Sequence, residues 1–252
     1  MATTLVCRVV SRQPVAVVAL YGTLDQTSVV RALVAMRDCL AEAPGVLLVD
    51  VAHLVVASPS ALTPVVGMIQ EARRWPAAQV GFCGGPAAVG AMFGDFAVGD
   101  RPLIYADLDA GLTEALTVPV APRATLSLRP VADSPSRARE FVTETCGGWG
   151  IGRIAKLASL IASELVTNAV VHARTPLAVS LRLTGPRLHV AVRDGDPRPM
   201  QRPAAEEGDG PVDHGRGLLI LDAMADEWGC HPTAEGKVVW AAIGLGRPPA
   251  AT

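Results

Sequence analysis

The sequence lacks the features that mark several classes of protein. Its formal net charge is −2 over 252 residues, so no excess of basic side chains is present to attract a nucleic acid. The five cysteines are scattered, without a C-x-x-C pair or a Cys/His cluster, which gives no indication of a zinc site or a disulfide framework. The N-terminus has no basic segment followed by an apolar one, as a signal peptide would, and we expect no apolar run long enough to span a bilayer. We therefore predict a protein of the reduced cytoplasm that contacts neither nucleic acid nor membrane directly.

The composition is that of a globular protein with room for more than one core. Half of the residues are hydrophobic, and the length suggests one or two domains. Residues 117–124 contain two prolines and small side chains without a helical period, so they are the best candidate for a boundary. We predict a first domain over residues 1–118, a linker over 119–125, a second domain over 126–246 and a tail over 247–252.

Strand-like and helix-like segments alternate in the first half. The predicted strands cover residues 15–20, 46–51 and 79–83, and the predicted helices cover residues 28–40, 60–74, 86–93 and 108–116. Such alternation predicts a sheet covered by helices.

The second half contains a carboxylate and a carboxamide that share one face of a predicted helix. Glu164 and Asn168 are four residues apart, within a segment whose apolar residues recur at helical spacing. An Asn oxygen suits a hard cation such as Mg²⁺, with phosphate oxygens completing its shell. A Glu at this distance can orient or deprotonate a water or a hydroxyl group. Taken alone, the pair is equally compatible with two exposed polar residues on a surface helix.

Two later segments favour a nucleotide site. The Val-rich strand 188–193 ends at Asp194, whose carboxylate is well placed to accept a hydrogen bond from an exocyclic amine such as that of adenine. A Gly-rich loop, 208–217, then leads directly into the apolar helix 218–224. Backbone N–H groups at a helix N-terminus bind phosphate, and glycines let the backbone approach it.

These segments, in this order, resemble the GHKL ATPase superfamily and, within it, the bacterial anti-sigma factor serine kinases. The resemblance covers about the last half of the chain, and its motifs are Glu164…Asn168…His172, Asp194-Gly195-Asp196-Pro197 and Gly215-Arg216-Gly217-Leu218. It implies ATP or ADP with Mg²⁺ as ligands and an α/β sandwich with a mixed sheet and helices on one face. The implied roles are catalytic base for Glu164, Mg²⁺ ligand for Asn168, adenine recognition for Asp194 and phosphate binding for Gly215 and Gly217. Gly195, Arg216 and Leu218 are implied to bind the cofactor as well. Two positions depart from the pattern: Asp196 replaces a Gly, and Lys237 replaces a Thr of many relatives.

The first half resembles a STAS domain, the fold of anti-sigma factor antagonists. The resemblance rests on residues 20–25 and on 57–62, where the family motif reads roughly D-S-S-G-L. Ser60 takes the position of the serine that the cognate kinase phosphorylates, but of that motif Ser60 and Leu62 alone survive. Ser is also a preferred helix N-cap, so we expect Ser60 to cap the following helix, whether or not it accepts phosphate. Likewise, Ser134 before Pro135 is expected to cap a helix over residues 137–146.

The fold expected is therefore α/β and α+β in two domains, and two functions remain open. The first is an ATP-dependent serine kinase and anti-sigma factor of a partner-switching pathway, with a sigma factor, a STAS-domain antagonist or its own STAS-like half as partner. The alternative is a non-enzymatic regulator, with or without nucleotide, that switches by docking its two domains. A sensor histidine kinase is disfavoured because no membrane segment or dimerising helical hairpin is expected before residue 126. Whether the chain forms a homodimer stays open.

Overall fold

The chain divides into two compact units, Met1–Val120 and Ala121–Thr252. The computed structural model describes residues 4–84, 102–198 and 216–246, and each unit is described here by itself. Residues 119–122 have no regular secondary structure, whereas a strand begins at Arg123. The last three residues of the predicted linker, 123–125, thus belong to the sheet of the second unit.

The first unit is built on a five-stranded sheet. Its strands are β1 (Val6–Ser11), β2 (Val15–Leu24), β3 (Val46–Val56), β4 (Gln79–Cys83) and β5 (Leu103–Tyr105), in the spatial order β1-β2-β3-β4-β5. β1 is antiparallel to β2, and the other neighbours are parallel. β1 and β5 were not predicted, because each is a short edge strand whose formation depends on its neighbour.

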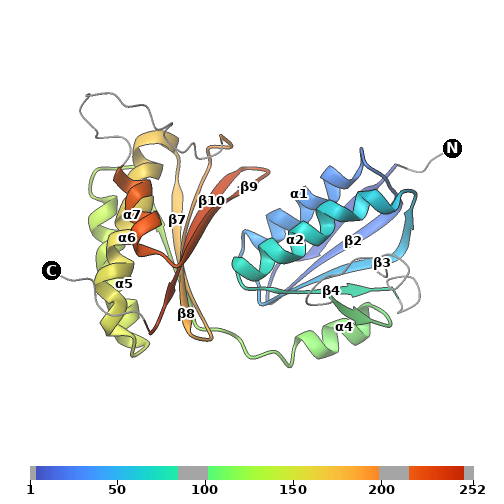
Figure 1. The fold of residues 1–252 in the computed structure, drawn as a ribbon, viewed down its shortest axis with the longest axis horizontal. Helices are drawn as coiled ribbons and strands as arrows, with labels where there is room; N and C mark the ends of the chain where they lie inside the picture. The colour runs from blue at the N-terminus through green and yellow to red at the C-terminus, as the bar shows by residue number, and fades with distance from the viewer. Residues whose placement is uncertain (1–3, 85–101, 199–215, 247–252) are drawn as a thin grey trace. The chain divides into compact units, whose positions relative to one another are not determined.

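Helices cover both faces of this sheet (Figure 1). α1 (Val29–Leu40) and α2 (Thr63–Arg74) pack on one face, and α4 (Leu108–Ala115) lies on the other. Along β2, Ala16 and Val18 belong to the core under α1 and α2, whereas Val15 and Val17 belong to the core under α4. Burial on both faces explains why residues 15–20 of β2 and 46–49 of β3 are continuously apolar, and the predicted helix-covered sheet is confirmed. The helix predicted over residues 86–93 lies outside the described residues.

Ser60 does not cap α2, contrary to the sequence prediction. It lies inside a short 3-10 helix, Pro59–Leu62, which precedes α2, and the residue at the N-cap of that 3-10 helix is Ser58. The Ser60 hydroxyl is 2.7 Å from the hydroxyl of Ser58 and accepts a hydrogen bond from Nε2 of Gln26 at 2.9 Å. The side chain therefore links this turn to the segment that follows β2.

The second unit is built on another five-stranded sheet. Its strands are β6 (Arg123–Leu128), β7 (Leu177–Thr184), β8 (Arg187–Asp194), β9 (Glu227–Thr233) and β10 (Gly236–Gly244), in the order β6-β7-β8-β10-β9. Every neighbouring pair among these described strands is antiparallel, so the mixed sheet expected from the resemblance is corrected. Two-residue turns join β7 to β8 and β9 to β10, and connections this short can join antiparallel strands only.

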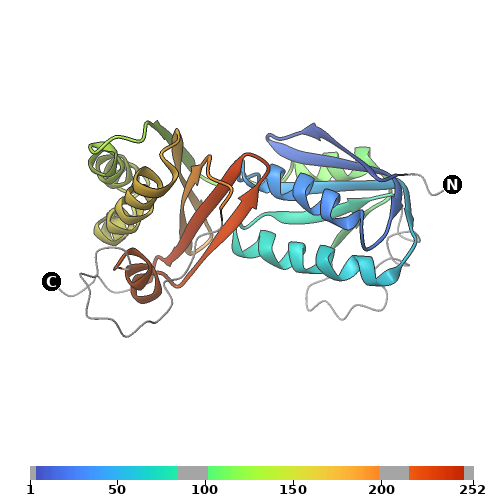
Figure 2. The same cartoon turned by 90° about the horizontal axis from the view of Figure 1, so that it is seen from above.

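The helices of the second unit lie on one face of its sheet, as predicted (Figures 1 and 2). They are α5 (Ser134–Gly148), a 3-10 helix (Gly152–Ile154), α6 (Ala155–Asn168), a π-helix (Ala169–Ala173) and α7 (Arg216–Met224). Ser134 is the first residue of α5 and does not cap it, because its hydroxyl donates to the carbonyl oxygen of Arg129 at 2.6 Å. The buried side chains of α5 and α6 pack on one another and on alternate residues of β7, β8 and β10.

One stretch of this unit corrects the expectation that no apolar run is long enough to cross a bilayer. The helical residues Gly152–Ala173 pass a test of length and composition for a membrane span. Most of this stretch is buried inside the second unit, where α6 is the central helix of the core. A core helix of a folded domain is apolar for that reason.

Candidate functional site

α6 holds the predicted carboxylate and carboxamide on a firmly packed helix. Its core face is fully buried, with Ile161 and Leu165 in contact with the sheet core, and Ser163 accepts a hydrogen bond from the guanidinium of Arg139 on α5 at 2.9 Å. A second link joins the hydroxyls of Ser159 and Thr143 at 3.0 Å. Since α6 is tied to both the sheet and α5, the residues on its remaining face are held in place.

Glu164 and Asn168 occupy that remaining face, one helical turn apart. Both are half-buried, and among the described residues neither side chain has a hydrogen-bond partner. A half-buried carboxylate next to an amide oxygen, with neither committed to the fold, offers ligands of the kind that Mg²⁺ prefers. This part of the predicted site is therefore free to serve a ligand.

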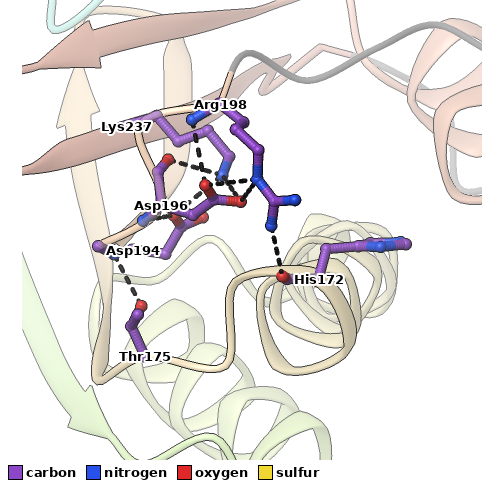
Figure 3. A network of polar contacts seen from close by, with 7 residues as sticks. His172, Thr175, Asp194, Asp196, Arg198 and Lys237 are labelled. Atoms are coloured by element: carbon purple, nitrogen blue, oxygen red, sulfur yellow. Dashed lines mark hydrogen bonds and ion pairs between the residues drawn. The ribbon is translucent and has the colours of Figure 1, made fainter.

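The helix changes character directly after Asn168. Residues Ala169–Ala173 form a single π-turn, which ends at Arg174 in the left-handed conformation, with φ of 55°. His172 was expected to follow Asn168 by one α-helical turn and to line the site. In the π-turn it is exposed instead, and its side chain extends away from the charged side chains around Asp194 that Figure 3 shows. The wider turn shifts each residue on the helix surface, so the spacing of four no longer places His172 above Asn168.

The C-terminal end of β8 lies beside this turn. The backbone N–H of Gly195 donates to the hydroxyl of Thr175 at 2.8 Å, and Nη2 of Arg198 donates to the carbonyl oxygen of His172 at 3.4 Å. These two bonds bring the segment after Asp194 against the segment that follows α6 (Figure 3). The structure thus places Asp194 and Gly195 at the same end of the unit as Asn168.

Asp194 is buried and its carboxylate already has two partners. Oδ1 accepts a hydrogen bond from Nζ of Lys237 at 3.0 Å and another from the backbone N–H of Asp196 at 2.9 Å. Lys237 comes from β10, which pairs with β8 in a register that sets Lys237 directly opposite Asp194. The exposed fractions of the two side chains are 3% for Asp194 and 9% for Lys237, so this ion pair is almost sealed from water.

Asp196 extends the pair into a cluster of four charged side chains. Its backbone carbonyl accepts from Nζ of Lys237 at 3.0 Å, and its carboxylate lies 3.5 Å from the same ammonium. On its other side, Nε of Arg198 donates to both carboxylate oxygens, at 2.9 and 3.2 Å. These hydrogen bonds from Arg198, strengthened by the nearby Lys237, hold the pKa of Asp196 well below its usual range.

The second glycine motif is described in part. Gly215, like the preceding loop, lies outside the described residues, and α7 begins at Arg216. Gly217 and Leu218 follow in its first turn. α7 packs against α6, so the start of α7 belongs to the same unit as Glu164 and Asn168. The phosphate-binding role of Gly215 and Gly217, and the cofactor-binding role of Arg216 and Leu218, stay predictions.

The residues present differ in how well they fit a bound Mg²⁺–nucleotide. The α6 end fits, because Glu164 and Asn168 are half-buried oxygen ligands without partners among the described residues. The β8 end differs, because the carboxylate expected to receive the adenine amine is already paired with Lys237 through Oδ1. Both bonds to this carboxylate go to Oδ1, so Oδ2 is the oxygen that could accept from a base.

Three residues at this end of β8, Lys237, Thr175 and Arg198, carried no site assignment in the sequence analysis. Lys237 was noted there as a departure from the family pattern, but its contact with Asp194 depends on a strand register that is not readable from spacing. Thr175 and Arg198 gave no signal, since their bonds join segments that are far apart in the chain. A search for a basic residue opposite Asp194 on the last strand would have found Lys237 alone.

Comparison with known proteins identifies the domain in the second unit. A family model described as "Histidine kinase-like ATPase domain" matches residues 129–243. The predicted ATPase domain of the GHKL type is therefore confirmed for the second unit. A search of curated proteins finds no match.

Two solved structures are similar to part of the chain. One is an anti-sigma factor antagonist from Mycobacterium paratuberculosis, with 18% identity, a TM-score of 0.35, and coverage of 46% of this chain and 99% of that one. The other is the anti-sigma factor antagonist SpoIIAA in its unphosphorylated form, with 16% identity, a TM-score of 0.36, and coverage of 46% and 99%.

Proposed function

We propose that this protein is a bacterial regulator of a partner-switching pathway, whose second unit is an ATP-dependent serine kinase and anti-sigma factor. The observation that carries the proposal is the pair Glu164 and Asn168, half-buried and unpartnered among the described residues, within a domain of the histidine kinase-like ATPase family. The pathway is proposed because the first half of the sequence resembles STAS domains, the fold of anti-sigma factor antagonists. The cytoplasm is the proposed location.

The proposed roles follow from the chemistry of each side chain. Bound ATP with Mg²⁺ would supply the transferable phosphoryl group. The amide oxygen of Asn168 would hold the metal, and the Glu164 carboxylate would orient the acceptor hydroxyl and take its proton. Phosphoryl transfer depends mostly on positioning and charge stabilisation, so a helix fixed by the contacts of Ser159 and Ser163 is a suitable platform.

The test is incubation of the full chain with labelled ATP and Mg²⁺, with and without a STAS-domain antagonist, followed by mapping of phosphorylated residues. Transfer to a serine of the antagonist, lost in Asn168→Ala, is the expected result. If calorimetry detects no nucleotide binding by the wild-type chain, or equal binding by Asn168→Ala, the assignment is wrong. Asp194→Ala should weaken binding of adenine nucleotides in particular.

A second candidate function is favoured by one observation. The ammonium of Lys237 is bonded to Oδ1 of Asp194 and compensates its charge, which favours a regulator that binds partners and retains little or no catalysis. Such a protein would capture a sigma factor or an antagonist without transferring phosphate. Titration of the full chain with a STAS-domain antagonist in the presence of ATP and Mg²⁺ separates the two: the kinase transfers phosphate to the antagonist, and the docking regulator binds it without transfer.

The first unit is proposed as a partner in cis. A short tether raises the concentration of one unit near the other to roughly millimolar, provided that it can span the sites. A protease site inserted into residues 119–122, which have no regular secondary structure, would release the tether after folding. Cleavage should tighten the binding of an external partner, and unchanged affinity would refute docking in cis. Ser60 stays a proposed phospho-acceptor, and stoichiometric phosphate on it would identify this loop as a substrate.

A further inference from the structure

The carboxylate of Asp194 is held through one of its two oxygens. Oδ1 accepts from Nζ of Lys237 at 3.0 Å and from the backbone N–H of Asp196 at 2.9 Å. An oxygen of a carboxylate offers two lone pairs, so both of those on Oδ1 are used. Oδ2 has no hydrogen-bond partner among the described residues, and it is not one of their unpartnered polar atoms that are sealed from solvent. The side chain therefore keeps one acceptor for a ligand.

The ammonium group of Lys237 fixes both this carboxylate and the backbone beside it. It also donates to the carbonyl oxygen of Asp196 at 3.0 Å, so the turn whose N–H reaches Oδ1 is held by the same lysine (Figure 3). The register of β10 with β8 sets Lys237 directly opposite Asp194. Two donors, one from the neighbouring strand and one from the turn, thus converge on Oδ1 and hold the carboxylate in one orientation. That orientation determines that Oδ2 is the oxygen left over.

Lys237 also supplies the counter-charge of this carboxylate. The side chain of Asp194 is 3% exposed, and burial without a counter-charge favours the neutral form of a carboxyl group. A neutral carboxyl group carries a proton and can donate, whereas an ionised carboxylate only accepts. The ammonium group therefore sets the chemical character of Oδ2 as well as its position.

We propose that Lys237 is a positioning residue that gives the nucleotide site its preference for adenine. It holds Oδ1 and leaves Oδ2 as an ionised acceptor, which matches the 6-amino group of adenine, a donor. Guanine and hypoxanthine carry an oxygen at position 6 instead, and that oxygen would face Oδ2 with no proton between them. The inference rests on the proposed nucleotide site and assigns to it the residue that fixes this choice.

The test compares the binding of ADP and of inosine diphosphate, each with Mg²⁺, to the full chain by calorimetry. Inosine diphosphate carries hypoxanthine, so it replaces the 6-amino group by an oxygen. We expect the wild type to bind ADP at least about tenfold more tightly, because a hydrogen bond to a charged acceptor is strong and the inosine oxygen cannot form it. A wild type that binds both nucleotides equally overturns the inference.

Asp194→Asn is the first variant, because the two donors on Oδ1 decide which way its amide points. Lys237 and the N–H of Asp196 both require an acceptor, so the amide oxygen takes the place of Oδ1. The NH₂ group then takes the place of Oδ2 and offers a donor to the base. We expect the preference to invert, with inosine diphosphate bound more tightly than ADP. An Asp194→Asn variant that still prefers ADP refutes the proposed orientation.

Lys237→Met separates a positioning role from a purely structural one. A structural loss lowers the affinity for both nucleotides by the same factor, and so does partial unfolding, so neither changes their ratio. Loss of the positioning group weakens ADP binding in particular, and we expect the ratio to fall toward one. Arg193→Met is the matched control, because it removes a positive charge from β8 that forms an exposed ion pair with Glu235. It should keep the wild-type ratio.

The outcomes separate this inference from the proposed function. Wild-type binding that is lost in Asn168→Ala, with an ADP preference that survives in Lys237→Met, leaves the proposed nucleotide site standing and refutes the role of Lys237. No binding of either nucleotide by the wild type refutes both. An ADP preference that inverts in Asp194→Asn, falls in Lys237→Met and persists in Arg193→Met is the result that the geometry predicts.

Discussion

The two ends of the candidate site differ in how their polar groups are used. On α6, Glu164 and Asn168 are half-buried and have no hydrogen-bond partner among the described residues. At the end of β8, Asp194 is bonded to Lys237 and to the backbone of Asp196. Both ends were predicted from the same kind of signal, a polar residue at a defined place on a helix or strand.

The difference separates residues that stabilise the fold from residues that are available to a ligand. A buried ion pair is part of the native structure, and its loss leaves an uncompensated charge. A half-buried carboxylate without a partner contributes little to stability, so its presence on a packed helix needs another reason. Substitutions on α6 should therefore lower activity with little effect on stability. Substitutions at the end of β8 should lower the free energy of unfolding.

The largest effect is expected at the α6 end, on catalysis. Glu164→Gln keeps the size and polarity of the side chain and removes its basicity. We expect phosphate transfer to fall by about 10²- to 10⁴-fold, the usual contribution of a general base, while ADP affinity is retained. Single-turnover transfer to a STAS-domain serine is the measurement. Transfer at the wild-type rate would show that Glu164 is not the base.

The next largest effect is expected at the β8 end, on stability. Lys237→Ala should lower the free energy of unfolding by about 3–5 kcal/mol, because it leaves the buried Asp194 carboxylate unpaired. Urea denaturation of the full chain, monitored for each unit, measures this loss. Glu164→Gln is the contrasting variant, expected to change the same free energy by less than about 0.5 kcal/mol. Similar losses for both variants would remove the distinction between the two ends.

A smaller effect is expected from the glycine that precedes Lys237. A Cβ on Gly236 would overlap the carbonyl oxygen of Asp194 and approach Cα of Gly195. Gly236→Ala must therefore push β10 away from the end of β8, which we expect to cost about 1–3 kcal/mol, as other overpacked sites do. Gly147→Ala in α5 is the control, since its Cβ meets nothing within 4 Å. Equal stability of the two variants would show that the ends of the strands can separate freely.

The smallest effect is expected from an ion pair of the same sheet that is open to solvent. Arg193 and Glu235 lie 3.3 Å apart, with side chains 33% and 83% exposed. Glu235→Gln should change the free energy of unfolding by less than about 1 kcal/mol, and by less still in high salt. A loss as large as that of Lys237→Ala would mean that burial is not what distinguishes the Asp194–Lys237 pair.

Much of the architecture was predictable because it depends on local periodicity. Apolar residues at helical spacing placed Glu164 and Asn168 together on α6, and continuous apolar runs marked the buried strands β3 and β4. Edge strands such as β1 were missed, because a short strand with an exposed face gives a weak pattern. The caps expected at Ser60 and Ser134 were wrong, since both hydroxyls found partners outside the helix that follows them.

What the sequence by itself determined is the set of chemical groups and their spacing along single elements. It placed a carboxylate four residues before an amide on one helix, and an Asp at the end of a strand. Only the tertiary structure decided that Lys237 faces Asp194, 43 residues earlier in the chain, and that Arg198 reaches the carbonyl oxygen of His172. The physical reason is that strand register is set by the packing of the whole sheet, where a shift of one residue would turn Lys237 to the opposite face.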